Sequence, residues 1–249
     1  MSRSAMMELI KHNIERSGRH LYSIMGGESP RFLYTIGVWR KADAEVVLAG
    51  CCAVPLPLVA DLLNEVGEEL EAGKDPAEVS HTLEGFGTFT LRKVHASWTT
   101  KLLLGALDYY EVPSIAAWQL TLDAEHATID QPDMTKPYSP EEHKVWQWVD
   151  GGWPYKVDPN TPVVSHLDAL KGRPVLEVLH WHDGQWEMFS KAAGEVPTEE
   201  CFGAPLATLV ASDSILGTLL DLPPGYEAVR DIDENGNDCG WEIYPLKPG

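Results

Sequence analysis

Residues 30–50 read PRFLYTIGVWRKADAEVVLAG, and this stretch decides the fold of the N-terminal half of the 249-residue chain. Two runs of β-branched and aromatic residues flank a charged segment, which is the pattern of two strands joined by a turn. Apolar residues at helical spacing predict a helix on each side, over residues 5–16 and 55–73. We expect further strands at 19–25, 86–94 and 115–122, and a helix at 99–110. The sequence therefore predicts an α+β domain whose mixed or antiparallel sheet is covered by helices.

Two motifs in this stretch, YTIG at 34–37 and AEVVLAG at 44–50, are followed directly by the predicted helix. Together with Tyr109-Tyr110, Pro113 and WQL at 118–120, they resemble the DUF4262 family of bacterial proteins over about residues 8–123. The resemblance implies a known kind of module but no chemistry, because the family has no established activity. The genomic surroundings of some members suggest roles near toxins.

The sequence changes character at about residue 130. Prolines and an aromatic cluster, Trp146, Trp148, Trp153 and Tyr155, occupy residues 130–162. Disordered linkers are poor in aromatic residues, so we expect an ordered connector here. Residues 163–249 then show two hairpin patterns around a helix-containing stretch, which predicts a smaller α+β module.

We therefore expect three parts: a DUF4262-like domain at 1–129, a Pro/Trp-rich connector at 130–162 and a C-terminal module at 163–249. Two segments of the last part, HDGQWEMF at 182–189 and DSILGTLLDLPPGYEAVR at 213–230, resemble a tail of uncharacterised bacterial proteins. No activity follows from that resemblance.

The charge balance limits the classes of molecule that the protein is expected to bind. The chain has 38 Asp and Glu against 19 Lys and Arg, a formal net charge of -19. Such a surface repels phosphate backbones and anionic lipid, so we expect no nucleic-acid and no membrane partner. It favours encounter with a basic protein, although solubility alone is an alternative explanation of the same composition.

Two further observations predict a cytoplasmic protein. No apolar run approaches the ~20 residues that span a bilayer, and the N-terminal segment lacks the apolar core of a signal peptide. Cys51 and Cys52 are adjacent, a spacing that disulfide geometry disfavours, and Cys201 and Cys239 stand alone. No Cys or His spacing typical of zinc is present, and we expect no cofactor.

A calcium loop is the sharpest motif near the C-terminus. Asp231, Asp233, Asn235, Gly236 and Glu242 satisfy the spacing of an EF-hand loop. The flanking sequences are not helical, and a hairpin turn at Asn235-Gly236 explains the same residues. We therefore do not expect calcium to bind.

His180, His182 and Asp183 form a second candidate metal site. Residues two apart on a strand share a face, so an H-x-H pair can ligate a metal; the sequence assigns no third ligand, although His166 is near. The alternative, which we favour, is a hairpin corner with solvated imidazoles.

A nucleophilic site is a third possibility. Cys51-Cys52 follows a predicted strand and precedes a helix, where the helix dipole lowers a thiol pKa, and His81 or His95 could serve as base. Packing of a small buried residue is the favoured alternative. The chain contains no G-x-S-x-G, P-loop or G-x-G-x-x-G motif.

Several polar residues interrupt the apolar strands. If their faces coincide, they line a pocket; otherwise they pair with buried backbone groups or face solvent, the alternative that we favour. These residues are Tyr34, Thr35, Glu45, Tyr110 and Gln119.

The functional hypothesis that follows is an acidic cytoplasmic binding protein, in its specific form an immunity-type inhibitor of a basic toxin or enzyme. Electrostatic steering would bring the partner in, and Trp146, Trp148 and Trp153 would anchor it. The alternative is a small hydrolase-type enzyme, with its site at the strand–helix junction of residues 45–52 or in a pocket at Tyr34 and Gln119. A metal-bound module that uses His180 and His182 is a third hypothesis.

Overall fold

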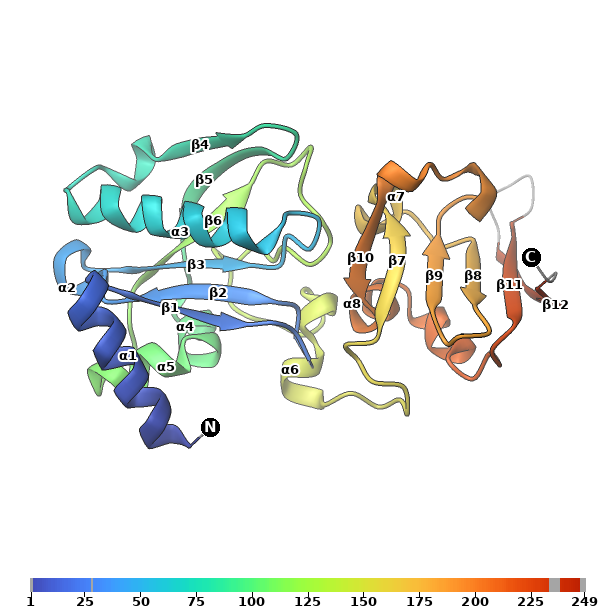
Figure 1. Cartoon of the computed structure of the whole chain (residues 1–249), viewed down its shortest axis with the longest axis horizontal. Coiled ribbons are helices and arrows are strands. Elements are labelled where there is room, and N and C mark those ends of the chain that lie inside the picture. Colours follow the sequence, from blue (N-terminus) through green and yellow to red (C-terminus); the bar gives the residue numbers. More distant parts are fainter. Residues whose placement is uncertain (1, 28, 233–237, 247–249) are drawn as a thin grey trace. The chain divides into compact units, whose positions relative to one another are not determined.

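The computed structural model describes residues 2–27, 29–232 and 238–246. Two compact units are present (Figure 1), the first made of residues 1–25, 31–127 and 131–143 and the second of residues 26–30, 128–130 and 144–249. Each unit contains a six-stranded sheet with one parallel pair among antiparallel ones. The predicted α+β class is therefore confirmed for both halves of the chain.

The first unit begins as the sequence predicts. The elements in order are α1 (Arg3–Ser17), β1 (His20–Ile24), β2 (Phe32–Ile36), α2 (Trp39–Ala42) and β3 (Glu45–Ala49). Ser2 caps α1 and Gly18 ends it in the left-handed conformation, with φ of 82°. β2 pairs antiparallel with both β1 and β3, which confirms the two strands of residues 30–50. The connection between them contains the short helix α2.

The remaining elements complete the first sheet. They are α3 (Leu56–Glu71), the 3₁₀ helix η1 (Pro76–Glu78), β4 (Ser80–Leu83), β5 (Gly87–Lys93), α4 (Ala96–Leu102), α5 (Leu104–Tyr110) and β6 (Ala117–Leu122). The strand order is β1-β2-β3-β6-β5-β4. Two details differ from the prediction: β4 has no counterpart in it, and the single helix of residues 99–110 is two helices that meet at Leu103.

Helices cover both faces of the first sheet. The apolar stripe of α3, with Val59, Leu62 and Val66, packs in one cluster with Val46 and Leu120 of the strands. α5 covers the opposite face of β2, where the Gly105 amide lies 3.0 Å from the Tyr34 hydroxyl. The strands β2 and β3 are buried at every position, so neither offers a solvent-facing side.

The second unit contains both predicted hairpins. Its helices are η2 (Lys144–Trp146), α6 (Trp148–Gly151), α7 (Leu167–Leu170), η3 (Ala193–Glu195), η4 (Thr198–Glu200), α8 (Leu206–Ser212) and η5 (Ser214–Leu219). Its strands are β7 (Pro162–His166), β8 (Glu177–His180), β9 (Trp186–Phe189), β10 (Cys201–Pro205), β11 (Tyr226–Ile232) and β12 (Asp238–Pro245), in the order β10-β7-β9-β8-β11-β12. β8 with β9 and β11 with β12 are antiparallel pairs. The turn of the second hairpin lies outside the described residues.

Side chains hold the proline-rich residues 130–162 in place, and the two units share this segment between them. In the first unit, Gln119 donates to the Pro132 carbonyl at 2.8 Å and Trp98 donates to the Lys136 carbonyl at 3.0 Å. In the second unit, the Trp146 indole donates to the Asp130 carbonyl at 2.9 Å. Proline cannot donate a backbone hydrogen bond, and these carbonyl contacts are among those that fix the segment, together with the Met134 and Tyr138 amides, which donate to Gln119 and Ser97.

Candidate functional site

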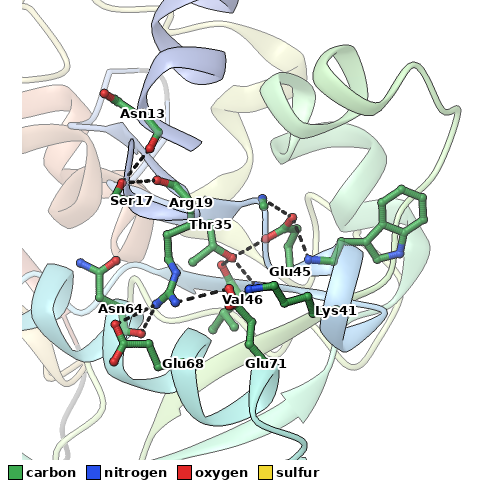
Figure 2. Close-up of polar contacts among 12 residues, drawn as sticks. Asn13, Ser17, Arg19, Thr35, Lys41, Glu45, Val46, Asn64, Glu68 and Glu71 are labelled. Atoms are coloured by element: carbon green, nitrogen blue, oxygen red, sulfur yellow. Dashed lines mark hydrogen bonds and ion pairs between the residues drawn. The ribbon is translucent and has the colours of Figure 1, made fainter. Parts of the chain in front are cut away.

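The carboxylate of Glu45 is the deepest polar centre of the first unit, with no exposed surface. One oxygen accepts the Thr35 hydroxyl at 2.5 Å (Figure 2). The other accepts the Tyr110 hydroxyl at 2.6 Å and the amides of Gly37 and Trp39 at 2.9 and 3.2 Å. Gly37 has φ of 127°, and a Cβ there would lie 2.7 Å from the Gly18 carbonyl, so only glycine fits. The carboxylate therefore fastens β2, α2, β3 and α5 together.

Burial and hydrogen bonding act in opposite directions on this group. Burial raises the pKa of Glu45, while the bonds from Thr35, Tyr110 and the two amides lower it, and the net direction is upward. Burial and the neighbouring Glu45 carboxylate raise the pKa of Tyr110. A carboxylate that accepts hydrogen bonds from four protein donors has a structural role.

Tyr34 and Gln119 also bond backbone groups within the first unit. Both side chains are about 1% exposed. The Tyr34 hydroxyl accepts the Gly105 amide, its ring stacks on Tyr22 at 5.2 Å, and burial raises its pKa. The Gln119 amide bonds the Pro132 carbonyl and the Met134 amide. The structure thus places Tyr34, Glu45 and Gln119 in separate backbone-fastening roles, the alternative favoured from the sequence.

A second polar network links Arg19, which directly precedes β1, with α2 and α3, and the sequence pattern does not indicate it. The Arg19 side chain is only 10% exposed. Arg19 donates to the Asn64 carbonyl at 2.5 Å and lies 3.3 Å from Glu71, which also pairs with Lys41 at 2.8 Å (Figure 2). The residues come from three segments of the chain, so their meeting depends on the tertiary fold.

The tryptophans of the connector divide into one core residue and a surface cluster. Trp146 is 1% exposed, so it is part of the second unit's core. Trp148 and Trp153 are half-buried and pack edge to face at 5.3 Å, and Trp153 packs likewise on Tyr155 at 4.8 Å. Of the three predicted anchors, Trp148 and Trp153 therefore retain partly accessible rings.

The structure places His180 of the candidate histidine pair among protein partners. The His180 ring bonds the Leu222 carbonyl at 2.6 Å and stacks on Trp186 at 3.9 Å. His180 and Val163 both pair with Trp186, so their side chains lie on the same face of the second sheet. His166 is three residues beyond Val163 on β7, and an odd separation along a strand places its side chain on the opposite face. Burial lowers the pKa of His166. Within the described residues, no group of three His, Cys, Asp or Glu side chains is placed to hold a metal.

The predicted calcium loop lies between two strands. Asp231 is on β11 and Glu242 is on β12, whereas Asp233 and Asn235 lie outside the described residues. Helices flank an EF-hand loop, and strands flank this one. The hairpin explanation of the motif therefore has the flanking elements that it requires.

Cys51 is buried at the strand–helix junction. Its thiol lies 3.2 Å from the Gln131 amide oxygen, and Arg31 donates to its carbonyl. His81 bonds Glu69 at 3.1 Å, and the Nδ1 atom of His95 accepts the Ser97 amide at the start of α4. Both imidazoles that the sequence offered as bases thus serve other partners.

The second sheet presents a face of alternating acidic and apolar side chains. Glu187, Leu179, Glu227 and Tyr244 form one cross-strand row, and Phe189, Glu177, Val229 and Glu242 form the next. We call these eight residues the acidic face. Val229 and Tyr244 are 37% and 43% exposed, whereas Leu179 and Phe189 of the same face are buried. Residues 163–249 contain 15 Asp and Glu against 5 Lys and Arg. More than half of the net charge therefore belongs to about a third of the chain.

The carboxylates of this face act on one another. Burial raises the pKa of Glu177, and the charges of Glu227, Glu187 and Glu195 raise it further. β12 is the edge strand of the sheet, and its Ile243, which is 56% exposed, pairs with Ala228 and so faces the side opposite the acidic face. The acidic face thus combines several carboxylates with the accessible side chains of Val229 and Tyr244, and two of the carboxylates accept hydrogen bonds, Glu177 from the Ala193 amide and Glu242 from the Tyr244 hydroxyl.

Residues 13–128 match the family model described as Domain of unknown function (DUF4262), which confirms the resemblance found in the N-terminal half. Neither a curated protein nor a solved structure matches the chain. The family match ends before the second sheet, so the resemblance of the C-terminal segments stays a prediction. No helix among the described residues is long and apolar enough to cross a membrane.

Proposed function

We propose that this protein is an acidic binding protein and that a basic protein partner docks on the acidic face of its second unit. The observation that carries the proposal is the sharing of one sheet face by Glu177, Glu187, Glu227 and Glu242. Like charges placed side by side cost stability, and a partner's Lys and Arg side chains would relieve that cost.

The same face supplies contacts that charge alone does not. Tyr244 and Val229 lie between the carboxylates and are accessible, and tyrosine is a frequent anchor of protein interfaces. The negative field would speed association and the apolar groups would slow dissociation. In its specific form, the partner is a basic toxin or enzyme that the protein occupies and inhibits in the cytoplasm.

The hydrolase-type alternative receives less support from the geometry. At residues 45–52, Glu45 is fully bonded and Cys51 is buried, and the family match assigns no activity. Turnover of an ester or peptide substrate that is lost in both Glu45→Gln and Cys51→Ala, with folding intact, would favour that alternative over binding.

A photocrosslinker at residue 244 tests the binding proposal. p-Benzoylphenylalanine replaces Tyr244 in cells, and the same probe at Leu104 of the first unit, which is 58% exposed, is the matched control. We expect one basic protein to be captured at position 244 and not at position 104. Capture of the same proteins at both positions, or of acidic proteins only, would refute the proposal.

Affinity measurements with the captured partner give the second readout. We expect Glu187→Gln, Glu227→Gln and Glu242→Gln together to weaken binding by roughly tenfold or more, mainly through slower association. The control combines Glu8→Gln, Glu65→Gln and Glu84→Gln in the first unit, which removes the same charge. Equal loss in both triple variants would show that net charge, not the acidic face, governs binding.

A further inference from the structure

The first unit has an open cleft of about 590 Å³. Trp39 of α2 and Lys93 at the end of β5 line it, together with Val94, His95 and the segment that precedes β6. Thr135, from the proline-rich segment, closes one side. The volume is in the range of small-molecule sites, and all of the lining belongs to a single compact unit.

The buried Glu45 holds two walls of this cleft in place. Its carboxylate accepts the Trp39 amide at 3.2 Å, and its own amide donates to the Ala116 carbonyl at 3.0 Å. A third wall is fixed where the Val94 amide donates to the Ala117 carbonyl of β6. The cleft is therefore preformed by backbone contacts and needs no rearrangement to receive a ligand.

The charge of the lining is opposite to that of the chain. None of the nine lining residues in this described part is acidic, although acidic residues outnumber basic ones two to one overall. Lys93 and His95 are exposed at the rim. The Nδ1 atom of His95 accepts the Ser97 amide, which leaves Nε2–H as the ring's donor in the neutral form. The nearby Asp133 carboxylate is bonded to the Thr135 hydroxyl at 2.6 Å.

We propose that this cleft binds a small organic anion with a flat apolar body. The apolar body would lie among Trp39, Ile115 and Ala116, and the carboxylate or similar group would meet the Lys93 ammonium, with His95 as a second donor. Charge-assisted hydrogen bonds of this kind favour the anion over its neutral amide. The proposal is independent of the acidic face, which belongs to the other unit.

The probes are 1-naphthoate, 1-naphthamide and 1-naphthylmethylammonium, titrated into the full-length protein and followed by calorimetry and by amide NMR shifts. We expect 1-naphthoate to bind 1:1 with a Kd of about 1 mM or below and the amide to bind roughly tenfold more weakly. The shifts should map to the amides of Val94, His95 and Ile115. No saturable 1-naphthoate binding, or shifts that map elsewhere, would overturn the proposal.

Charge reversal at the rim tests the role of Lys93. Lys93 is exposed on the last position of β5, so Lys93→Gln and Lys93→Glu should fold, and Lys171→Gln in the second unit is the matched control. We expect Lys93→Gln to weaken 1-naphthoate binding roughly tenfold, and Lys93→Glu to prefer the ammonium probe. Binding that ignores both substitutions would overturn the assignment of the anion site.

Discussion

Replacement of Glu45 by alanine tests whether this carboxylate fastens the first unit. The change removes the hydrogen-bond acceptor of the Trp39 amide and of the Tyr110 hydroxyl. The Gly37 amide keeps the Tyr110 oxygen as an acceptor at 2.7 Å. Each buried donor that loses its acceptor lowers the free energy of unfolding by about 1–3 kcal/mol, and the lost contacts of the side-chain methylene add about 1 kcal/mol. We therefore expect Glu45→Ala to lower the free energy of unfolding by about 3–7 kcal/mol.

Glu45→Gln separates the hydrogen bonds from the charge. The amide oxygen can keep the three donors of one carboxylate oxygen, and the amide NH₂ can donate to Thr35, whose hydroxyl turns to the Val46 carbonyl 3.5 Å away. Because burial raises the pKa of Glu45, the charged form gains little from the site, and we expect a cost within about 1 kcal/mol.

The pH dependence has a definite sign. An acid whose pKa is higher in the folded state contributes stability that is fully present below its unfolded pKa of 4.5 and is lost as pH rises through the folded pKa. The stability of wild type relative to Glu45→Gln should therefore fall as pH rises from 4.5. A rise over the same range would show that the ionised form is the stabilised one.

Urea unfolding followed by circular dichroism measures the global change, and hydrogen exchange in peptides from β2 and β3 assigns it to the first unit. The exposed Glu84→Ala is the control, with an expected change within about 0.5 kcal/mol. A cost for Glu45→Gln as large as that for Glu45→Ala would show that the negative charge is required. A cost below about 1 kcal/mol for Glu45→Ala would refute the fastening role.

Three further predictions concern stability. The Thr88 amide and His126 hold the pKa of Asp123 at about 2, so the stability that Asp123 adds is present above pH 3.8 and is lost as pH falls toward 2. Because the side chain is 35% exposed, screening limits this contribution to about 1 kcal/mol, and acid unfolding of Asp123→Asn should lack it. Trp146→Phe removes the bond to the Asp130 carbonyl and should cost about 2 kcal/mol in urea unfolding. Arg230→Met removes the ion pair between Arg230 and Asp213, whose atoms lie 2.6 Å apart. It should lower the free energy of unfolding by about 3 kcal/mol, measured as faster hydrogen exchange in β11.

Much of the fold could be predicted from local patterns. The alternation of β2 and β3 and the apolar stripe of α3 encode their own structure, because each pattern is repeated within a few residues. The break at Leu103 carries no such signal. The Gly105 amide reaches Tyr34, which lies 71 residues earlier, and a contact across that distance in the chain cannot be seen in a local window. β4 was missed because its SHTL sequence is a short, half-exposed edge strand.

The candidate sites depend on the pairing register of the strands and on contacts between elements far apart in the chain, and a single sequence shows neither. Glu45 and Tyr110 could be singled out as polar residues in apolar surroundings, but their 2.6 Å contact joins elements 65 residues apart. The acidic face appears only once Glu187 is placed opposite Leu179 and Leu179 opposite Glu227. A shift of one residue in any of these strands would have moved its carboxylate to the opposite face.

The acidic residues of α3 and those of the acidic face have different charged neighbours, and this contrast bears on the proposed binding function. On α3, partial burial raises the pKa of Glu69, but hydrogen bonds from Lys74 and His81 outweigh it and the net pKa is lowered. Glu71 of the same helix forms ion pairs with Arg19 and Lys41. On the acidic face, burial and then the neighbouring carboxylates raise the pKa of Glu177, although the Ala193 amide donates to it. A charge that is already paired adds to stability and leaves little for a partner, whereas an unpaired one retains its full attraction. In the proposed function, the carboxylates of the acidic face are the ones that a basic partner meets.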